Sequence, residues 1–137
     1  WLKLCFVVMA HRLTFENSTE LGVFARLTNS YCLLAQPPVE ATVESQKFYA
    51  EFARVFGDDL PVVQVSIGGN RIVGRVCVGN RHGLLVPSIT TDAEIAAISQ
   101  GVPGNVRVHR VEERLSALGN CIVCNDSMAL VHTDLDT

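Results

Sequence analysis

The chain has 137 residues, of which 48% are hydrophobic and 18% are charged, and its formal net charge is −3. This apolar content excludes an intrinsically disordered chain, and the length fits one domain or part of one. A pI near 5.8 leaves no basic field to hold a phosphate backbone, so neither DNA nor bare RNA is an expected partner. Five irregularly spaced cysteines favour reduced thiols in a cytosolic or nuclear protein.

The stretch from Leu2 to Ala10 is apolar apart from Lys3. It is too short to span a bilayer, and no clear small-residue cleavage site follows it. We therefore expect no direct contact between this protein and a membrane.

The first part of the chain predicts strands and then a helix. Strands are expected where apolar residues alternate with polar ones or run together between turn residues, over 12–15, 23–27 and 31–35. Pro37 and Pro38 then break the ladder, so residues 36–44 are expected as a loop. A helix is expected over 45–56, ending at Gly57, because apolar side chains recur on one of its faces: Phe48, Phe52, Val55 and Phe56.

The middle of the chain predicts further strands and a capped helix. Strands are expected over 62–67, 71–78 and 84–86. Thr91 to Glu94 has the spacing of a capping box, in which the two side chains satisfy free N–H groups at a helix start. Ile95, Ile98 and Val102 continue the apolar face of this helix.

The last part of the chain repeats the strand pattern. Valines alternate with polar residues over 106–111, and apolar runs follow over 118–124 and 128–131. Thr133 to Asp136 then has the pattern of another helix start.

An internal repeat organises these elements. VCVGNRHGLLVP, residues 76–87, is two apolar runs around a glycine-flanked polar tip, which predicts a strand, a tight turn and a strand. NSYCLLAQ at 29–36 and NDSMALVH at 125–132 are weaker copies, so Asn29, Asn80 and Asn125 mark a repeat with spacings of 51 and 45. A period of about 45 residues with short strands and one helix differs from WD40, which has no helix, and favours an α+β radial array.

Several stretches closely resemble the translation initiation factor 6 family, the eukaryotic and archaeal ribosome anti-association factors. They are VCVGNRHGLLVP, TTDAE at 90–94, RVEERLSALGN at 110–120 and CNDSMALVH at 124–132. The resemblance runs from about Met9 to the last residue. It implies a pentein-type β/α-propeller, five units closed into a ring, of which this chain carries an incomplete arc of two units and most of a third.

The resemblance also divides the chain. The units are expected at 9–59, 60–104 and 105–137, the third one truncated. MAHRLTFENSTELG, residues 9–22, resembles a natural start, so residues 1–8 are expected as a non-native extension, against the alternative of a genuine one. Because a repeat buries its apolar faces only between neighbours, we expect a fragment of a product with about two further units.

The function implied by the resemblance is steric. The protein would bind the large (60S) ribosomal subunit, chiefly a ribosomal protein near the sarcin–ricin loop, and prevent premature association with the small subunit. It would also take part in large-subunit biogenesis, in the cytoplasm and the nucleus or nucleolus, as a monomer when full length. Arg and Asn side chains suit a polar protein surface, so four residues assigned to turn tips are the ribosome-binding candidates: Arg75, Asn80, Arg81 and Asn120.

No cofactor, metal or catalytic residue is expected. Cys121 and Cys124 have C-x-x-C spacing, but zinc needs four ligands and the sequence has no second pair. His82 could act as a general base or could simply bond the backbone of its own turn. Gly68 and Gly69 precede a strand, so they do not match a phosphate-binding loop.

The sequence leaves two alternatives to the anti-association factor. A guanidine-modifying enzyme on the same propeller fold is the first, although Cys32 and Cys77 sit in predicted strands with no obvious partner. The second is a maturation factor that never acts in translation, which the sequence does not separate from the main hypothesis.

Overall fold

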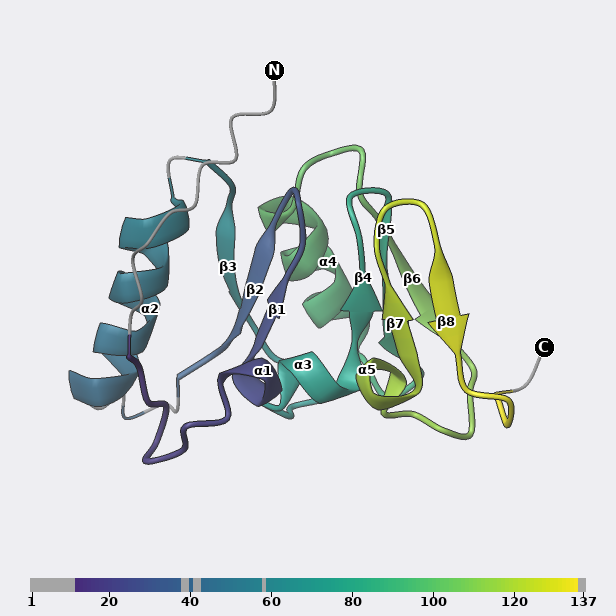
Figure 1. The fold of residues 1–137 in the computed structure, drawn as a ribbon, viewed down its shortest axis with the longest axis horizontal. Helices are drawn as coiled ribbons and strands as arrows, with labels where there is room; N and C mark the ends of the chain where they lie inside the picture. Colours follow the sequence, from purple (N-terminus) through teal and green to yellow (C-terminus); the bar gives the residue numbers. More distant parts are fainter. Residues whose placement is uncertain (1–11, 38–39, 41–42, 58, 136–137) are drawn as a thin grey trace, which may run out of the picture.

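The structure is a computed structural model that describes residues 12–37, 40, 43–57, 59–135. Within this part of the chain, a unit of a four-residue helix and a β-hairpin occurs three times, and the first two units continue into a longer helix and a strand (Figure 1). The first unit contains α1 (Leu21–Phe24), β1 (Ala25–Leu27), β2 (Cys32–Ala35), α2 (Val43–Phe56) and β3 (Val62–Val65). The second contains α3 (Val73–Val76), β4 (Val78–Gly79), β5 (Gly83–Pro87), α4 (Asp92–Gly101) and β6 (Arg107–Val111). The third contains α5 (Leu118–Cys121), β7 (Ile122–Cys124) and β8 (Ala129–Val131).

The sheets follow the same plan. β1 and β2 form an antiparallel hairpin, and β3 pairs parallel to β2 after the crossover through α2. β4, β5 and β6 repeat this order, with α4 as the crossover. A parallel pair requires such a long connection, whereas a hairpin needs only a turn. Among the described residues, β7 and β8 form a two-stranded sheet.

The units stand side by side, so that the molecule has two distinct ends (Figure 1). The three short helices, α1, α3 and α5, lie together at the lower end of the view, which we call the helix end. The turns of the three described hairpins lie at the opposite end, which we call the hairpin end. The longer helices α2 and α4 pack against the sheets, with Phe48 and Ile98 fully buried.

Close backbone contact joins the short helices. A Cβ atom built on Gly74 of α3 would overlap the carbonyl oxygen of Gly22 in α1, and one on Gly119 of α5 would overlap that of Gly74. The Arg26 guanidinium donates a hydrogen bond to the same Gly74 carbonyl. Only glycine allows this approach, so the helix end depends on the residue type at these two positions.

The structure confirms the mixed α and β class and several predicted elements. The helix expected over 45–56 is α2, which begins two residues earlier, and Thr91 and Glu94 form the capping box at the start of α4. The strands expected over 31–35, 62–67, 84–86, 106–111 and 128–131 are present with shifted ends, as β2, β3, β5, β6 and β8.

The strands expected over 23–27, 71–78 and 118–124 are partly wrong. Each run contains a short helix, α1, α3 or α5, and only its last residues continue as a strand. Packing between the short helices overrides a local preference that favours strands. Residues 12–15 are also not a paired strand within the described chain, where Phe15 forms only an isolated bridge with Ser18.

Some of the expected features lie partly or wholly outside the part of the chain that the structure describes. Residues 133–135 are not helical, and the rest of that expected helix start lies outside the described chain, as does the extension 1–8. The unit boundaries expected at 59/60 and 104/105 stay predictions. The last strand of the first sheet, β3, ends at Val65, and that of the second, β6, ends at Val111. No described helix has the length and apolar character needed to cross a membrane.

Candidate functional site

A side-chain oxygen organises the turn of each described hairpin. Asn80 Oδ1 accepts hydrogen bonds from the N–H groups of His82 and Gly83, at 2.9 and 3.3 Å. Asn125 Oδ1 does the same for its own turn, with N–H donors at 2.8 Å. In the first hairpin the acceptor is Thr28 Oγ1, with donors at 3.2 and 3.0 Å. Short polar side chains favour turns by mimicking a backbone acceptor in this way.

The repeat register derived from the sequence therefore needs a correction. Thr28, and not Asn29, is the counterpart of Asn80 and Asn125, so the first spacing is 52 rather than 51. Asn29 takes the next place in the turn, where the other hairpins have Arg81 and Asp126. The sequence suggested the wrong match because threonine and asparagine make the same turn contact through different atoms.

Asp126 ties the hairpin end together. Its carboxylate accepts from the backbone N–H of Arg81 at 3.0 Å and from Asn29 Nδ2 at 2.5 Å, and it pairs with the Arg81 guanidinium at 2.7 Å. These donors, the Arg81 N–H first, hold the pKa of Asp126 at about 2. Asn80 Nδ2 donates to the Asn125 carbonyl at 3.0 Å. The turn residues line a hollow of about 430 Å³ at the hairpin end. The polar groups around this hollow are thus largely bound to one another.

The sequence prediction for this end is partly confirmed. The Arg81 side chain is 53% exposed at the tip of a strand–turn–strand unit, as expected, and Asn80 is half-buried. Leu84 and Val86 point inward and are fully buried. The sequence did not reveal that Arg81 is paired with a carboxylate 45 residues away.

Arg75 and Asn120 lie at the other end of the molecule. They follow the contact glycines in α3 and α5, so the expectation that all four candidates occupy turn tips on one side is wrong. Both side chains are exposed. Arg75 has a long ion pair with Glu20 at 3.4 Å, and the Asn120 side chain has no hydrogen-bond partner among the described residues. The helix end therefore offers an amide without a partner among the described residues and a cation held by one long, exposed ion pair.

A second carboxylate, Glu94, has a structural role that the sequence showed only in part. Besides capping α4, it accepts from the N–H groups of Gly68 and Gly69 at 2.9 and 3.0 Å and from Ser66 Oγ at 2.7 Å. Burial alone would raise its pKa, but these hydrogen bonds and that of the Thr91 N–H lower it to about 2. The carboxylate thereby fixes the start of α4 to the turn that follows β3.

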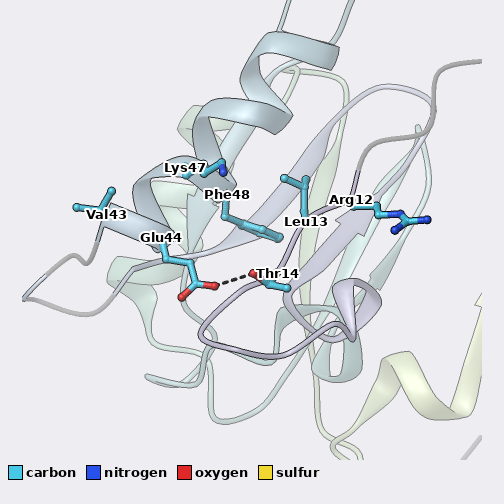
Figure 2. A pocket seen from close by; sticks show the side chains of 7 residues that line it. All are labelled: Arg12, Leu13, Thr14, Val43, Glu44, Lys47 and Phe48. Carbon is cyan, nitrogen blue, oxygen red and sulfur yellow. Dashed lines mark hydrogen bonds between the residues drawn. The ribbon is translucent and has the colours of Figure 1, made fainter.

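The first unit has a pocket at the start of α2, which corresponds to the surroundings of Glu94 at the start of α4 (Figure 2). Arg12, Leu13 and Thr14 line one side, and four residues from the first turns of α2 line the other: Val43, Glu44, Lys47 and Phe48. Thr14 Oγ1 donates to the Glu44 carboxylate at 2.6 Å, which matches the Ser66–Glu94 contact of the second unit. The pocket has a volume of about 360 Å³.

The cysteines are poorly suited to catalysis. Burial raises the pKa of Cys32 and of Cys77 to about 12 each, which keeps both thiols protonated at neutral pH. Among the described residues, no three His, Cys, Asp or Glu side chains are grouped in a way that could hold a metal ion. Cys121 and Cys124 are free thiols.

The fold and its two ends define a β/α repeat protein with polar surfaces presented by short helices and turns. The chain belongs to the eIF-6 family, whose sequence pattern matches residues 10–137. The members of this family named below are translation initiation factors of protein biosynthesis and not enzymes.

Curated relatives agree with this assignment. The chain is 54% identical over 128 residues to eukaryotic translation initiation factor 6-2 of Arabidopsis thaliana, which covers 93% of this chain and 50% of the relative. It is 53% and 52% identical to eukaryotic translation initiation factor 6 of Drosophila melanogaster and Saccharomyces cerevisiae, with the same coverage. The chain thus spans about half the length of these relatives.

Proposed function

We propose that this protein binds the large ribosomal subunit and prevents its premature association with the small subunit, by occupying the joining surface. The same proposal includes a role in large-subunit biogenesis, in the nucleolus and the cytoplasm. Its support is membership of a family of translation initiation factors, together with exposed polar groups at the helix end. The mechanism is steric and requires no chemical step.

Of the two ends of the molecule, the helix end is better suited than the hairpin end to contact the ribosome. A group that already has hydrogen bonds must lose them before it binds a partner, which cancels much of the gain. Arg81 and Asn80 are engaged with Asp126 and Asn125, whereas Asn120 has no such commitment within the described chain. Arg75 has only its 3.4 Å pair with Glu20, which is exposed and therefore weak. We assign the primary contact to Arg75 and Asn120.

The ring expected from the sequence is also part of this proposal. The three described units recur at similar spacings along the sequence, and their hairpin turns converge on Asp126. Such convergence is what a radial array requires, and we propose that two further units complete a five-unit pentein ring in the whole protein.

Co-sedimentation with isolated large subunits tests the binding site. A full-length form carrying Arg75→Ala or Asn120→Ala should pellet with about tenfold weaker affinity, the loss expected for a central polar contact. Arg107→Ala is the matched control, because Arg107 is an exposed cation outside the helix end, and it should bind like the unaltered protein.

The possible results separate the site from the function. If the unaltered protein pellets and both variants pellet equally well, the assignment of the helix end is wrong while ribosome binding stands. If the unaltered protein remains in the supernatant, the ribosome-binding proposal itself is wrong. Pelleting without any effect on subunit joining would support the maturation factor instead.

A further inference from the structure

Arg26 interrupts the pattern of the repeat. The pairing registers place Arg26, Val78 and Val123 at equivalent positions, because each lies opposite a leucine of its own hairpin: Leu33, Leu85 and Leu130. Arg26 is half-buried, and Val78 is fully buried. Withdrawing a charged group from water costs free energy unless it finds polar partners. An arginine where the other units have valine therefore indicates a role that belongs to the first unit alone.

The Arg26 side chain reaches from the first unit to the short helices of the next two. Its Nη2 donates a hydrogen bond to the Gly74 carbonyl in α3. A Cβ atom built on Gly119 of α5 would lie 2.5 Å from the same nitrogen. The last carbonyl groups of a helix have no donor within it, and Arg26 supplies one to α3 from outside. One guanidinium thus contacts both of the helices that lie side by side at the helix end in Figure 1.

Cys77 holds the same guanidinium on its other side. Burial raises the pKa of Cys77 to about 12, against a smaller opposing effect of the Arg26 charge and of a hydrogen bond from the Arg26 side chain. The protonated thiol donates in turn to the Val73 carbonyl at 3.0 Å. Arg26 is therefore bound at two places along α3, which restricts its side chain to one orientation.

The two residues that Arg26 touches directly precede the two candidate contact residues. Arg75 follows Gly74, and Asn120 follows Gly119. The Gly74 carbonyl and the Arg75 N–H belong to one planar peptide unit, so a bond that fixes the first also orients the second. Gly119 rests against that carbonyl and against Arg26 Nη2. The separation of Arg75 from Asn120 thus depends on Arg26.

We propose that Arg26 is a positioning residue for the contact surface at the helix end. By holding the Gly74 peptide unit against Gly119, it sets the spacing at which Arg75 and Asn120 meet a polar protein surface. A preorganised pair of contacts binds more tightly, because less freedom is lost on association. The ribosomal part of this inference rests on the proposed function, whereas the positioning itself does not. All the atoms that carry it lie at contacts between consecutive units.

Amide hydrogen exchange, followed by NMR on the full-length protein, tests the positioning. Arg26→Met removes the donor, so the N–H groups of Arg75 and Asn120, which donate to Ile72 and Ala117 at 3.0 and 2.9 Å, should be released more often. Their exchange should be at least about tenfold faster, while that of α2 stays unchanged. Arg26→Lys keeps a donor and should restore slow exchange. No change in these amides, or an equal acceleration throughout the protein, would overturn the proposal.

Co-sedimentation with isolated large subunits tests the consequence for binding. Arg26→Met should weaken pelleting about tenfold, and Arg26→Lys by no more than about threefold. Arg54→Met is the matched control, because Arg54 is an exposed arginine whose ion pair with Glu51 lies within α2, and it should bind like the unaltered protein. When Arg26→Met is already present, Asn120→Ala should cost much less than it does alone, because both act through one arrangement.

The possible results separate positioning from direct contact and from the proposed function. If the losses of Arg26→Met and Asn120→Ala simply multiply, Arg26 acts independently of Asn120 and the positioning role is overturned. If the unaltered protein remains in the supernatant, the ribosomal function is wrong, and hydrogen exchange still decides the positioning. Arg26→Gln, which removes the charge, takes the place of Arg26→Met in both experiments should that variant fail to fold.

Discussion

Asn29 and Asp126, which are 97 residues apart in sequence, share a hydrogen bond of 2.5 Å between the amide nitrogen and the carboxylate. Through it, the turn of the first hairpin contacts the turn of the third. Arg81, from the second hairpin, binds the same carboxylate. One side chain thus joins all the hairpins of the described chain, and its charge state should influence how they are held together.

The charge of Asp126 should make stability depend on pH in a defined window. Folding lowers its pKa from 3.8 to about 2, so its stabilising effect is present above about pH 4 and is lost as the pH falls through about 2. Asp126→Asn should lower the thermal midpoint at pH 7, and the difference from the unaltered protein should be much smaller near pH 2. Thermal unfolding followed by circular dichroism at both pH values measures this. An equal difference at the two pH values would show that charge plays no part.

Glu94 should contribute more than a helix cap. Glu94→Ala leaves the N–H groups of Gly68, Gly69 and Thr91 without their acceptor, so we expect a loss of about 2 kcal/mol in the free energy of unfolding. Asp92→Ala is the control, because Asp92 lies in the same helical turn and is exposed. Urea unfolding of both variants measures these losses. If the two variants lose equal free energy of unfolding, Glu94 acts only through its charge at the start of the helix.

Gly74 should tolerate no side chain. Gly74→Ala places a methyl group against the carbonyl oxygen of Gly22, so the two helices must separate, at a cost of about 3 kcal/mol or more. Gly22→Ala is the matched control, since the same position in α1 has nothing within 4 Å and should be neutral or slightly stabilising. Chemical denaturation of the two variants measures the contrast. Similar midpoints would mean that α1 and α3 can move apart freely.

Thr28 should be replaceable by asparagine. Thr28→Asn keeps a side-chain acceptor for the N–H groups of Ser30 and Tyr31, as Asn80 provides in its own turn, so stability should stay within about 0.5 kcal/mol. Thr28→Val removes that acceptor and should cost about 1 kcal/mol. The thermal midpoints of both variants test this. A Thr28→Val variant as stable as the unaltered protein would refute the role of Thr28 in the turn.

Part of this structure could be predicted from local sequence alone. The apolar stripe through Phe48 and Phe52 predicts α2, and the spacing of Thr91 and Glu94 predicts the start of α4, because both signals depend on residues within one or two helical turns. The repeat is also visible, since similar turns and strands return at similar spacings. These features require no knowledge of which residues meet across the fold.

The location of the candidate contact residues was decided by tertiary structure. Arg75 and Asn120 lie in apolar runs whose sequence predicts strands, but in the structure they belong to α3 and α5. There the backbones of three short helices are in contact at Gly22, Gly74 and Gly119. That contact joins residues about 50 positions apart, which no local pattern reports. In the same way, Arg81 reads as a solvated turn residue until the third hairpin brings Asp126 within 2.7 Å of it. Sequence periodicity determined the repeating units, whereas the packing of one unit on the next determined which of their polar groups remain free.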